Sequence, residues 1–275
     1  MEKNVTKFLF WNIHKRYDNV ERAIRFGIDE SIDIIALIEA PIETKDKIAT
    51  AGFPYRVLEH FDIDLRRGIE VLVSPTIDVK ESNFCREEKR FCILRNDIID
   101  INLAVVHLNS GMSVNADDIR QTDISQLNDA LNRIEGLKDS KNTMVIGDFN
   151  INVMDKQMLD FSGLNARLFA YQTQKGVKTI HDAEKDIFYN PMLSVYRDTD
   201  DPEKARATYY YEGSHLQWLC YDQVLLKQSL MTRFSRESLQ VIDLMNGEHL
   251  VKDNKIDIGI SDHLPVYFEL NNVEA

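Results

Sequence analysis

Residues 143–150 read TMVIGDFN, an apolar run that ends at a glycine and continues into two polar residues around a phenylalanine. Thr143 to Ile146 has the length and apolar character of a strand covered on both faces. Asp148 and Asn150 follow at once, and the ends of rigid elements are where proteins usually place their chemistry. Gly-Asp-x-Asn is also an ordinary turn sequence, so this tetrapeptide alone does not separate a site from a turn.

Working outward, apolar runs of the same style recur and predict a strand-rich core. Residues 32–38 (IDIIALI) are near-continuously apolar, whereas Val266, Phe268 and Leu270 alternate with other residues, as in a strand with one buried face. The predicted strands are Lys7 to Ile13, Ile32 to Ile38, Gly68 to Val73, Phe91 to Leu94, Ile98 to His107, Thr143 to Ile146, Asp222 to Leu226 and Leu264 to Leu270.

Helices are predicted between these strands, over Asp18 to Glu30 and Ala116 to Ile134. The second is the clearer, because apolar residues recur in it near helical spacing. They are Ile119, Ile124, Leu127, Leu131 and Ile134. Residues 151–205 are polar with few periodic signals and are expected to form surface helices and loops. This mixture favours an α/β chain in which two sheets pack together with helices outside. No linker or repeat divides the chain, so residues 1–275 are expected to form a single domain.

The charge balance limits the kinds of partner. Lys and Arg number 33 against 45 Asp and Glu, which gives a formal charge of -12. This argues against a protein that coats nucleic acid or anionic membrane through bulk electrostatics. It does not exclude a nuclease, because a cluster of acids can hold a metal ion that reverses the local sign of charge.

Cys85, Cys92 and Cys220 are odd in number and show no CxxC spacing, so they are expected to be buried thiols in a reducing compartment. The short apolar run FLFW, residues 8–11, is too short for a signal sequence or a membrane span, and no later segment is long enough. The expected location is the cytoplasm, with no membrane partner.

Polar residues follow several of the predicted strands, and together they match the needs of phosphoester hydrolysis. That reaction uses a hard cation held by oxygen ligands, a base for the attacking water, and donors where negative charge builds on phosphoryl oxygens. The residues that supply this inventory are Asn12, Glu39, His107, Asp148, Asn150, Asp262 and His263. Each has a structural explanation when taken singly, as a turn residue, a helix cap or a satisfied histidine.

These blocks resemble those of the endonuclease/exonuclease/phosphatase superfamily, in its order and roughly its spacing. FWN (10–12) resembles the opening strand motif and DIIALIE (33–39) the strand that delivers the metal-binding Glu. GDFN (147–150) and SDHLPV (261–266) are the most specific matches. YDQVLL (221–226) resembles the strand whose Asp orients the catalytic His, and with the preceding tyrosines looks most like uncharacterised bacterial members. The resemblance implies a four-layered α/β/β/α sandwich of two packed mixed sheets.

The resemblance also implies a metal site for Mg²⁺ or Mn²⁺. Glu39 would be the principal ligand, with Asn12 and Asp262 close to that metal or to a second one. Ile38 stands where many members have Gln before the Glu, and Cys220 where many have Arg two residues before the orienting Asp. These two departures leave the substrate open, because groups behind the ligands tune a site.

The same resemblance implies the catalytic roles. Asp148 would position and deprotonate the water, and Asn150 would hold the water or the phosphate. His263 would contact the scissile phosphate, oriented by Asp222, and His107 would touch another phosphate oxygen.

Two groups of residues bear on the substrate. Arg66 and Arg67, with Lys15 and Arg16, could meet a phosphate backbone or be solvated loop charges. The aromatic residues near the YDQVLL strand could stack on bases or pack a core. They are Tyr209, Tyr210, Tyr211 and Trp218.

Three hypotheses follow. The leading one is a nuclease that cuts nucleic-acid phosphodiester bonds, since the Trp-Cys-Asp-Arg signature of the inositol phosphatases is missing. The alternatives are a hydrolase of small phosphoesters, such as a nucleotide, sugar or lipid head-group phosphate, and a catalytically degenerate acidic binding module. No protein partner can be deduced.

Overall fold

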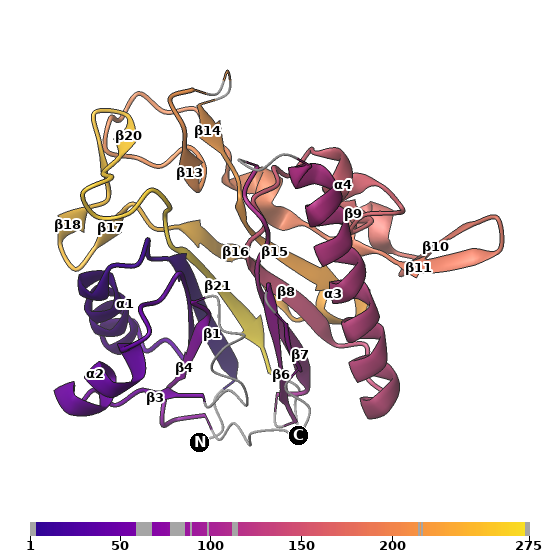
Figure 1. Ribbon diagram of the computed structural model, residues 1–275, viewed down its shortest axis with the longest axis horizontal. Coiled ribbons are helices and arrows are strands. Elements are labelled where there is room, and N and C mark those ends of the chain that lie inside the picture. The colour runs from indigo at the N-terminus through magenta and orange to yellow at the C-terminus, as the bar shows by residue number, and fades with distance from the viewer. Residues whose placement is uncertain are drawn as a thin grey trace.

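The computed structural model describes residues 4–58, 68–77, 86–88, 90–97, 99–111, 115–213, 215 and 217–272. Two mixed β-sheets pack against each other (Figure 1). The strands of the first sheet run in the order β16 (Phe234–Val241), β21 (Val266–Asn271), β1 (Val5–Asn12), β2 (Ile34–Ile38), β4 (Glu70–Val73) and β3 (Arg56–Val57). Those of the second run in the order β5 (Arg86–Glu88), β6 (Phe91–Asn96), β7 (Ile101–His107), β8 (Thr143–Asp148), β15 (Asp222–Lys227), β12 (Phe188–Tyr189) and β9 (Ala166–Arg167).

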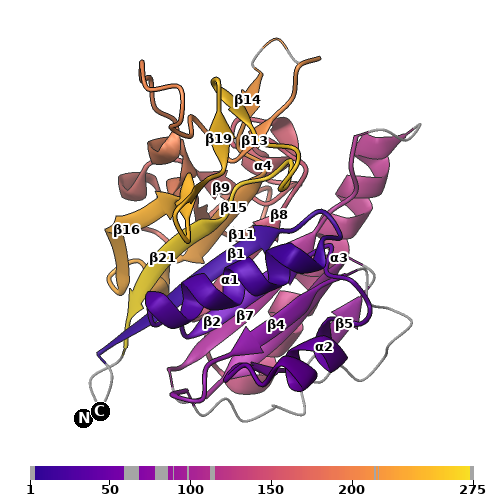
Figure 2. The ribbon, with the colours of Figure 1, turned by 90° about the vertical axis from the view of Figure 1, so that its left-hand side faces the viewer.

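Helices cover the outer faces of the pair of sheets. α1 (Tyr17–Asp29) and α2 (Thr44–Ala51) lie across the first sheet, as Figure 2 shows from the front. α3 (Ala116–Lys138) lies along the outer face of the second sheet on the opposite side of the molecule (Figure 1). The order of layers is therefore α/β/β/α, which confirms the predicted four-layered sandwich.

Side-chain alternation explains why the central strands of the second sheet are apolar along most of their length. In β7, Leu103 and Val105 point into the core between the two sheets. Their neighbours Ala104 and Val106 point the other way, into a cluster that includes Leu127 of α3. Because successive residues of a strand face opposite sides, a strand with a layer on each side buries every position, and a near-continuous apolar run is the result.

The predicted helix stripe on α3 holds except at its first member. Ile124, Leu127, Leu131 and Ile134 are buried, but Ile119 is 37% exposed. Five residues separate Ile119 from Ile124, which turns the side chain by roughly 140° at about 100° per residue. Ile119 therefore falls outside the face that packs on the sheet.

Residues 151–205 depart from the prediction of surface helices and loops. Short helices are present, namely α4 (Lys156–Leu159), η1 (Ala170–Thr173) and η2 (Pro191–Val195). However, β9 and β12 extend the second sheet beyond β15 and bury Ala166 and Phe188 in the core under α3. Two-residue strands are too short to show a period of two, so the sequence carried no pattern for them.

The remaining elements are short and lie between the larger ones. They are the hairpin β10 (Val177–Ile180) and β11 (Ala183–Asp186), the pair β13 (Tyr209–Tyr210) and β14 (Trp218–Leu219), η3 (Gln228–Leu230), the pair β17 (Leu244–Met245) and β18 (Glu248–His249), and the pair β19 (Val251–Lys252) and β20 (Lys255–Ile256). Within the described part of the chain, none of the helices is long and apolar enough to cross a lipid bilayer. Cys92 and Cys220 are buried, as predicted, and Cys85 lies outside the described residues.

Gly147, one residue before Asp148, allows β7 and β8 to approach closely. Its φ is 131°, and a Cβ built on it would lie 2.2 Å from the carbonyl oxygen of Val106. Gly147→Ala is therefore expected to lower the free energy of unfolding by about 3 kcal/mol or more, because both the backbone strain and the clash oppose the native strand pairing. Urea denaturation followed by circular dichroism measures the change.

The matched control is the same substitution at Gly136 on α3, where nothing lies within 4 Å of the added Cβ. Gly136→Ala is expected to raise the free energy of unfolding by up to about 1 kcal/mol, since alanine is the better helix former. Equal effects of the two substitutions would show that the close approach at Gly147 does not limit stability.

Candidate active site

Strand topology brings the predicted site residues to one end of the sandwich. β1 and β2 are parallel neighbours, with Asn12 opposite Ile38, so Glu39 follows directly at the same edge. β7 and β8 are likewise parallel, with His107 opposite Asp148. β15 runs antiparallel to β8, and its first residue, Asp222, lies opposite Asp148. Residues far apart in the chain therefore converge because their strands end, or begin, at one edge.

Asp148 is the centre of the hydrogen-bond network. Its Oδ2 accepts hydrogen bonds from Asn12 Nδ2 at 3.1 Å and Asn150 Nδ2 at 3.2 Å, and its Oδ1 accepts one from the Asn150 backbone N–H at 2.8 Å. Asn12 belongs to the first sheet and Asp148 to the second, so this contact ties the two sheets together at the site. The Asn150 amide also donates to the Leu108 carbonyl at 3.0 Å, which holds its turn in place.

His263 comes from the loop before β21 and is fixed by its main chain. Trp11 Nε1 donates to the His263 carbonyl at 2.9 Å, and the His263 N–H donates to Ser261 Oγ at 3.2 Å. Ser261 Oγ in turn donates to the Asn12 carbonyl at 2.8 Å. These bonds anchor the Ser261–His263 loop to the end of β1 independently of the contacts of the His263 ring.

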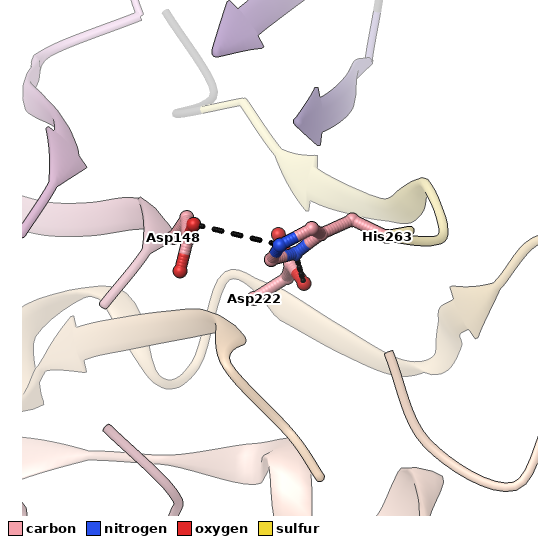
Figure 3. Close-up of side chains that lie close together, drawn as sticks. All are labelled: Asp148, Asp222 and His263. Atoms are coloured by element: carbon pink, nitrogen blue, oxygen red, sulfur yellow. Dashed lines mark hydrogen bonds and ion pairs between the residues drawn. The ribbon is translucent and has the colours of Figure 1, made fainter. Parts of the chain in front are cut away.

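The His263 ring stands between two buried carboxylates (Figure 3). Its Nδ1 lies 2.8 Å from Asp222 Oδ2, and its Nε2 lies 3.8 Å from Asp148 Oδ2. All three side chains are buried. The contact with Asp222 fixes one side of the imidazole, and Nε2 faces the Asp148 carboxylate, the candidate base.

Burial and charge act in opposition on this pair. Burial raises the pKa of the Asp222 carboxyl, and the charge and hydrogen bond of His263 offset only part of that rise. Burial lowers the pKa of the His263 imidazole, but the negative charges of Asp222 and Asp148 and the Asp222 hydrogen bond outweigh it, so the pKa is raised overall. The arrangement therefore favours a positively charged imidazolium at neutral pH.

Glu39 sits in a strained turn at the end of β2. Its φ is 56°, in the left-handed region that non-glycine residues rarely adopt. Gly68 makes the turn possible: a Cβ there would lie 2.9 Å from Glu39 Cα, and the Gly68 carbonyl accepts a hydrogen bond from the Ala40 N–H at 2.7 Å. The Glu39 carboxylate lies 3.7 Å from His107 Nε2, which lies 3.8 Å from Asp148 Oδ2. His107 therefore stands between the two acids.

The basic residues after β1 lie on the Glu39 side of the site. The Lys15 N–H donates to the Glu39 carbonyl at 3.0 Å, and His14 Nδ1 lies 3.1 Å from Asp262 Oδ1. The Arg16 guanidinium, however, donates to the carbonyls of residues 258 and 259. Arg66 and Arg67 lie outside the described residues, so the structure does not place the second predicted basic cluster.

Comparison with known proteins bears on the fold. No protein-family model matches the chain, and no curated protein matches its sequence. Solved structures do match, over nearly the whole chain. A humanized TDP2 from D. rerio is 15% identical with a TM-score of 0.57, and the match covers 98% of this chain and 100% of that one.

Two further structures match similarly. The AP endonuclease LMAP from Leishmania major is 13% identical with a TM-score of 0.57, over 98% of this chain and 89% of that one. The 3′ phosphatase NExo from Neisseria, bound to a product DNA hairpin, is 14% identical with a TM-score of 0.54, over 97% and 99%. The chain has the endonuclease/exonuclease/phosphatase fold.

The carboxylates of Glu39, Asp148 and Asp262 are suited to bind a metal ion. Among the described residues, the ion-pair partners of Glu39, Asp148 and Asp262 are all histidines, with no Lys or Arg in range. Asp148, Asp222 and His263 also form a buried group whose possible ligand atoms lie within 4.8 Å of one another. Because Nδ1 of His263 is engaged by Asp222, the oxygen donors fit a hard cation best.

Two residues outside the predicted catalytic and metal-binding sets also contact the site. Arg120 of α3 donates to the Asn150 carbonyl at 3.1 Å. The Tyr209 ring packs on the His263 ring, with centroids 4.6 Å apart. The aromatic run at 209–211 was a sequence signal for Tyr209. Arg120 had no such signal, because it lies 30 residues before Asn150.

Asp222→Asn tests the orienting role within this fold. The substitution preserves shape but removes the charge that stabilises the His263 imidazolium. We expect kcat for phosphoester hydrolysis to fall by at least about tenfold, with little change in metal affinity. Steady-state kinetics and a metal titration measure the two quantities. Weakened metal binding with unchanged kcat would mean that Asp222 serves the metal instead of the histidine.

Proposed function

We propose that this chain is a divalent-metal-dependent hydrolase that cuts phosphodiester bonds in nucleic acids. The observation that supports this best is the buried row of Asp222, His263 and Asp148, with Glu39 beyond His107 at the same edge. The row offers a base, a charged donor and a separate acid for a metal ion. Phosphoester hydrolysis needs all three.

Each side chain then has a chemical task. Asp148 accepts the proton of the attacking water, while the amides of Asn12 and Asn150 hold its carboxylate in one orientation. His263 donates to a phosphoryl oxygen as charge develops there, and Asp222 keeps its ring and charge in place.

The metal and the remaining polar groups complete the proposed roles. Glu39, with Asn12 and Asp262, would hold a divalent cation such as Mg²⁺ or Mn²⁺, which neutralises phosphoryl charge and activates water when bound. His107, which stands between Glu39 and Asp148, would contact a second phosphoryl oxygen.

Support for a nucleic-acid substrate comes from proteins of similar fold. One is an AP endonuclease, and another is a 3′ phosphatase bound to a DNA hairpin. A small phosphoester remains the second candidate, and one observation favours it: the exposed Arg16 guanidinium already donates to two main-chain carbonyls, which reduces its capacity to contact a phosphate backbone. A degenerate binding module is the least favoured, because all the predicted catalytic side chains are present.

A metal-supplemented activity panel over DNA, RNA and small phosphoesters tests the proposal. We expect hydrolysis of a polynucleotide, with KM rising as salt is added, because phosphate contacts release counterions. A His263→Ala preparation made in parallel controls for contaminating nucleases. Turnover of small phosphoesters alone, insensitive to salt, would favour the second candidate. Turnover of none of the substrates would contradict hydrolysis.

A further inference from the structure

Tyrosine rings extend from the catalytic histidine toward solvent. The Tyr209 ring packs on His263 and stacks on Tyr221, with centroids 4.9 Å apart and ring planes 23° apart. Tyr209 is also bridged to His263 through the main chain, and the Leu264 N–H donates to the Thr208 carbonyl at 2.8 Å. The rings therefore have a fixed position beside His263, the residue proposed to contact the scissile phosphate.

Tyr211 continues this row. It follows Tyr209 by two residues and keeps the strand pairing, because its N–H donates to the Gln217 carbonyl at 2.8 Å. Alternate residues of a strand share a face, so Tyr211 points the same way as Tyr209. The pairing of β13 with β14, in which Tyr209 lies opposite Leu219 and Tyr210 opposite Trp218, is thus continued at Tyr211.

The solvent exposure of Tyr210 and Tyr211 indicates that the first packs in the scaffold and the second is open to a ligand. Tyr210 points to the opposite face and packs edge-on against Trp218, with centroids 5.3 Å apart. Trp218 is buried, so this pair belongs to the scaffold. Tyr211 is 54% exposed, and its ring lies against Gly213, where a Cβ would come within 2.8 Å of it. A ring held by its turn but left open to solvent is suited to contact a ligand.

We propose that Tyr211, with Tyr209 and Tyr221 behind it, is a stacking platform for a nucleobase next to the scissile phosphodiester, so that the substrate is a single-stranded or unpaired segment. This proposal rests on the proposed function and names its substrate class. Every nucleobase has a flat face that stacks on an aromatic ring, whereas a duplex keeps its bases stacked on one another.

Stacking also accounts for how an acidic protein holds a polyanion. The formal charge is -12, and carboxylates crowd the site. Affinity that depends on many phosphate contacts needs a basic groove. A neutral base on a tyrosine ring contributes affinity with no cation, and it places the adjoining phosphate close to His263.

The test compares two oligomers with the same backbone charge: single-stranded oligothymidylate, and a matched oligomer in which tetrahydrofuran sites replace every nucleoside. We expect Tyr211→Ala to raise KM for oligothymidylate about tenfold or more, with little change in kcat, and to leave KM for the base-free oligomer unchanged. Tyr211→Phe keeps the ring and should restore KM. Tyr171→Ala removes a tyrosine on η1 that is more exposed still, at 69%, and should change neither value.

A binding measurement tests the platform without requiring catalytic activity. Fluorescence anisotropy of the labelled oligomers measures Kd in Mg²⁺ for the His263→Ala protein, which is expected to cleave them only slowly. Introducing Tyr211→Ala into this protein should raise Kd for oligothymidylate about tenfold. Equal losses for both oligomers, or no loss for either, would overturn the platform. If the wild-type protein cleaves both oligomers while Tyr211→Ala has no effect, only the platform fails. If it cleaves no phosphoester at all, the proposed function fails separately.

Discussion

Asp148→Asn and His263→Ala are each expected to lower kcat for phosphoester hydrolysis by at least about 10²-fold, the usual scale for a positioned base or a charge-stabilising donor. Asn at 148 keeps the hydrogen-bonding shape but cannot accept the water's proton. Ala at 263 removes the imidazole that stands 3.8 Å from Asp148 and leaves Asp222 buried without its partner. Steady-state kinetics on the best substrate of the activity panel measures both.

The double variant sharpens this prediction. Because the two side chains act on one chemical step, their combined loss should be far smaller than the product of the single losses. Asp253→Asn, at an exposed turn and outside the proposed catalytic and metal-binding residues, is the matched control and should leave kcat unchanged. Losses that multiply would show that Asp148 and His263 do not work together. Circular dichroism of each variant checks that the fold is retained.

Removal of the metal is expected to abolish activity. Hydrolysis should require Mg²⁺ or Mn²⁺ and vanish in excess chelator, because the acids at the site are oxygen donors and, within the described residues, no Lys or Arg pairs with them. Glu39→Gln should raise the metal concentration for half-maximal activity by at least about tenfold. Removal of a direct ligand should lower metal affinity at least as much as removal of a residue that only supports a ligand.

Glu43→Gln controls for the general effect of one lost charge, because Glu43 is exposed four residues further along the same loop. It should leave the metal dependence unchanged, and the thermal unfolding of both variants should resemble that of the parent. Full activity of the wild-type protein in excess chelator would contradict the metal-dependent mechanism, whatever the substrate.

Much of the fold could be predicted because burial leaves a direct mark on local sequence. Residues 34–38 are apolar throughout, and the β2 strand that they form is covered on both faces. Val266, Phe268 and Leu270 alternate with other residues, and only this alternate set is buried in β21. The candidate site could be predicted for a related reason. Its polar residues follow these strands, and a strand that ends in polar groups is visible without knowledge of its neighbours.

Other features depended on contacts between distant segments. β16 shows no period of two, because it lies at the edge of its sheet and its register against β21 shifts between Ser235 and Gln240. Arg120 reaches the Asn150 carbonyl only because α3 packs over β8.

Local sequence determined which residues are apolar, where the strands stop and which acids, amides and histidines stand at the stops. Only the tertiary structure decided that Asn12 donates across the two sheets to Asp148 and that Tyr209 packs on the His263 ring. It also decided that the Trp11 indole holds the His263 main chain by a hydrogen bond between residues 252 positions apart. The physical reason is that pairing of strands and packing of sheets join residues far apart in the chain, and no short stretch of sequence records its partner.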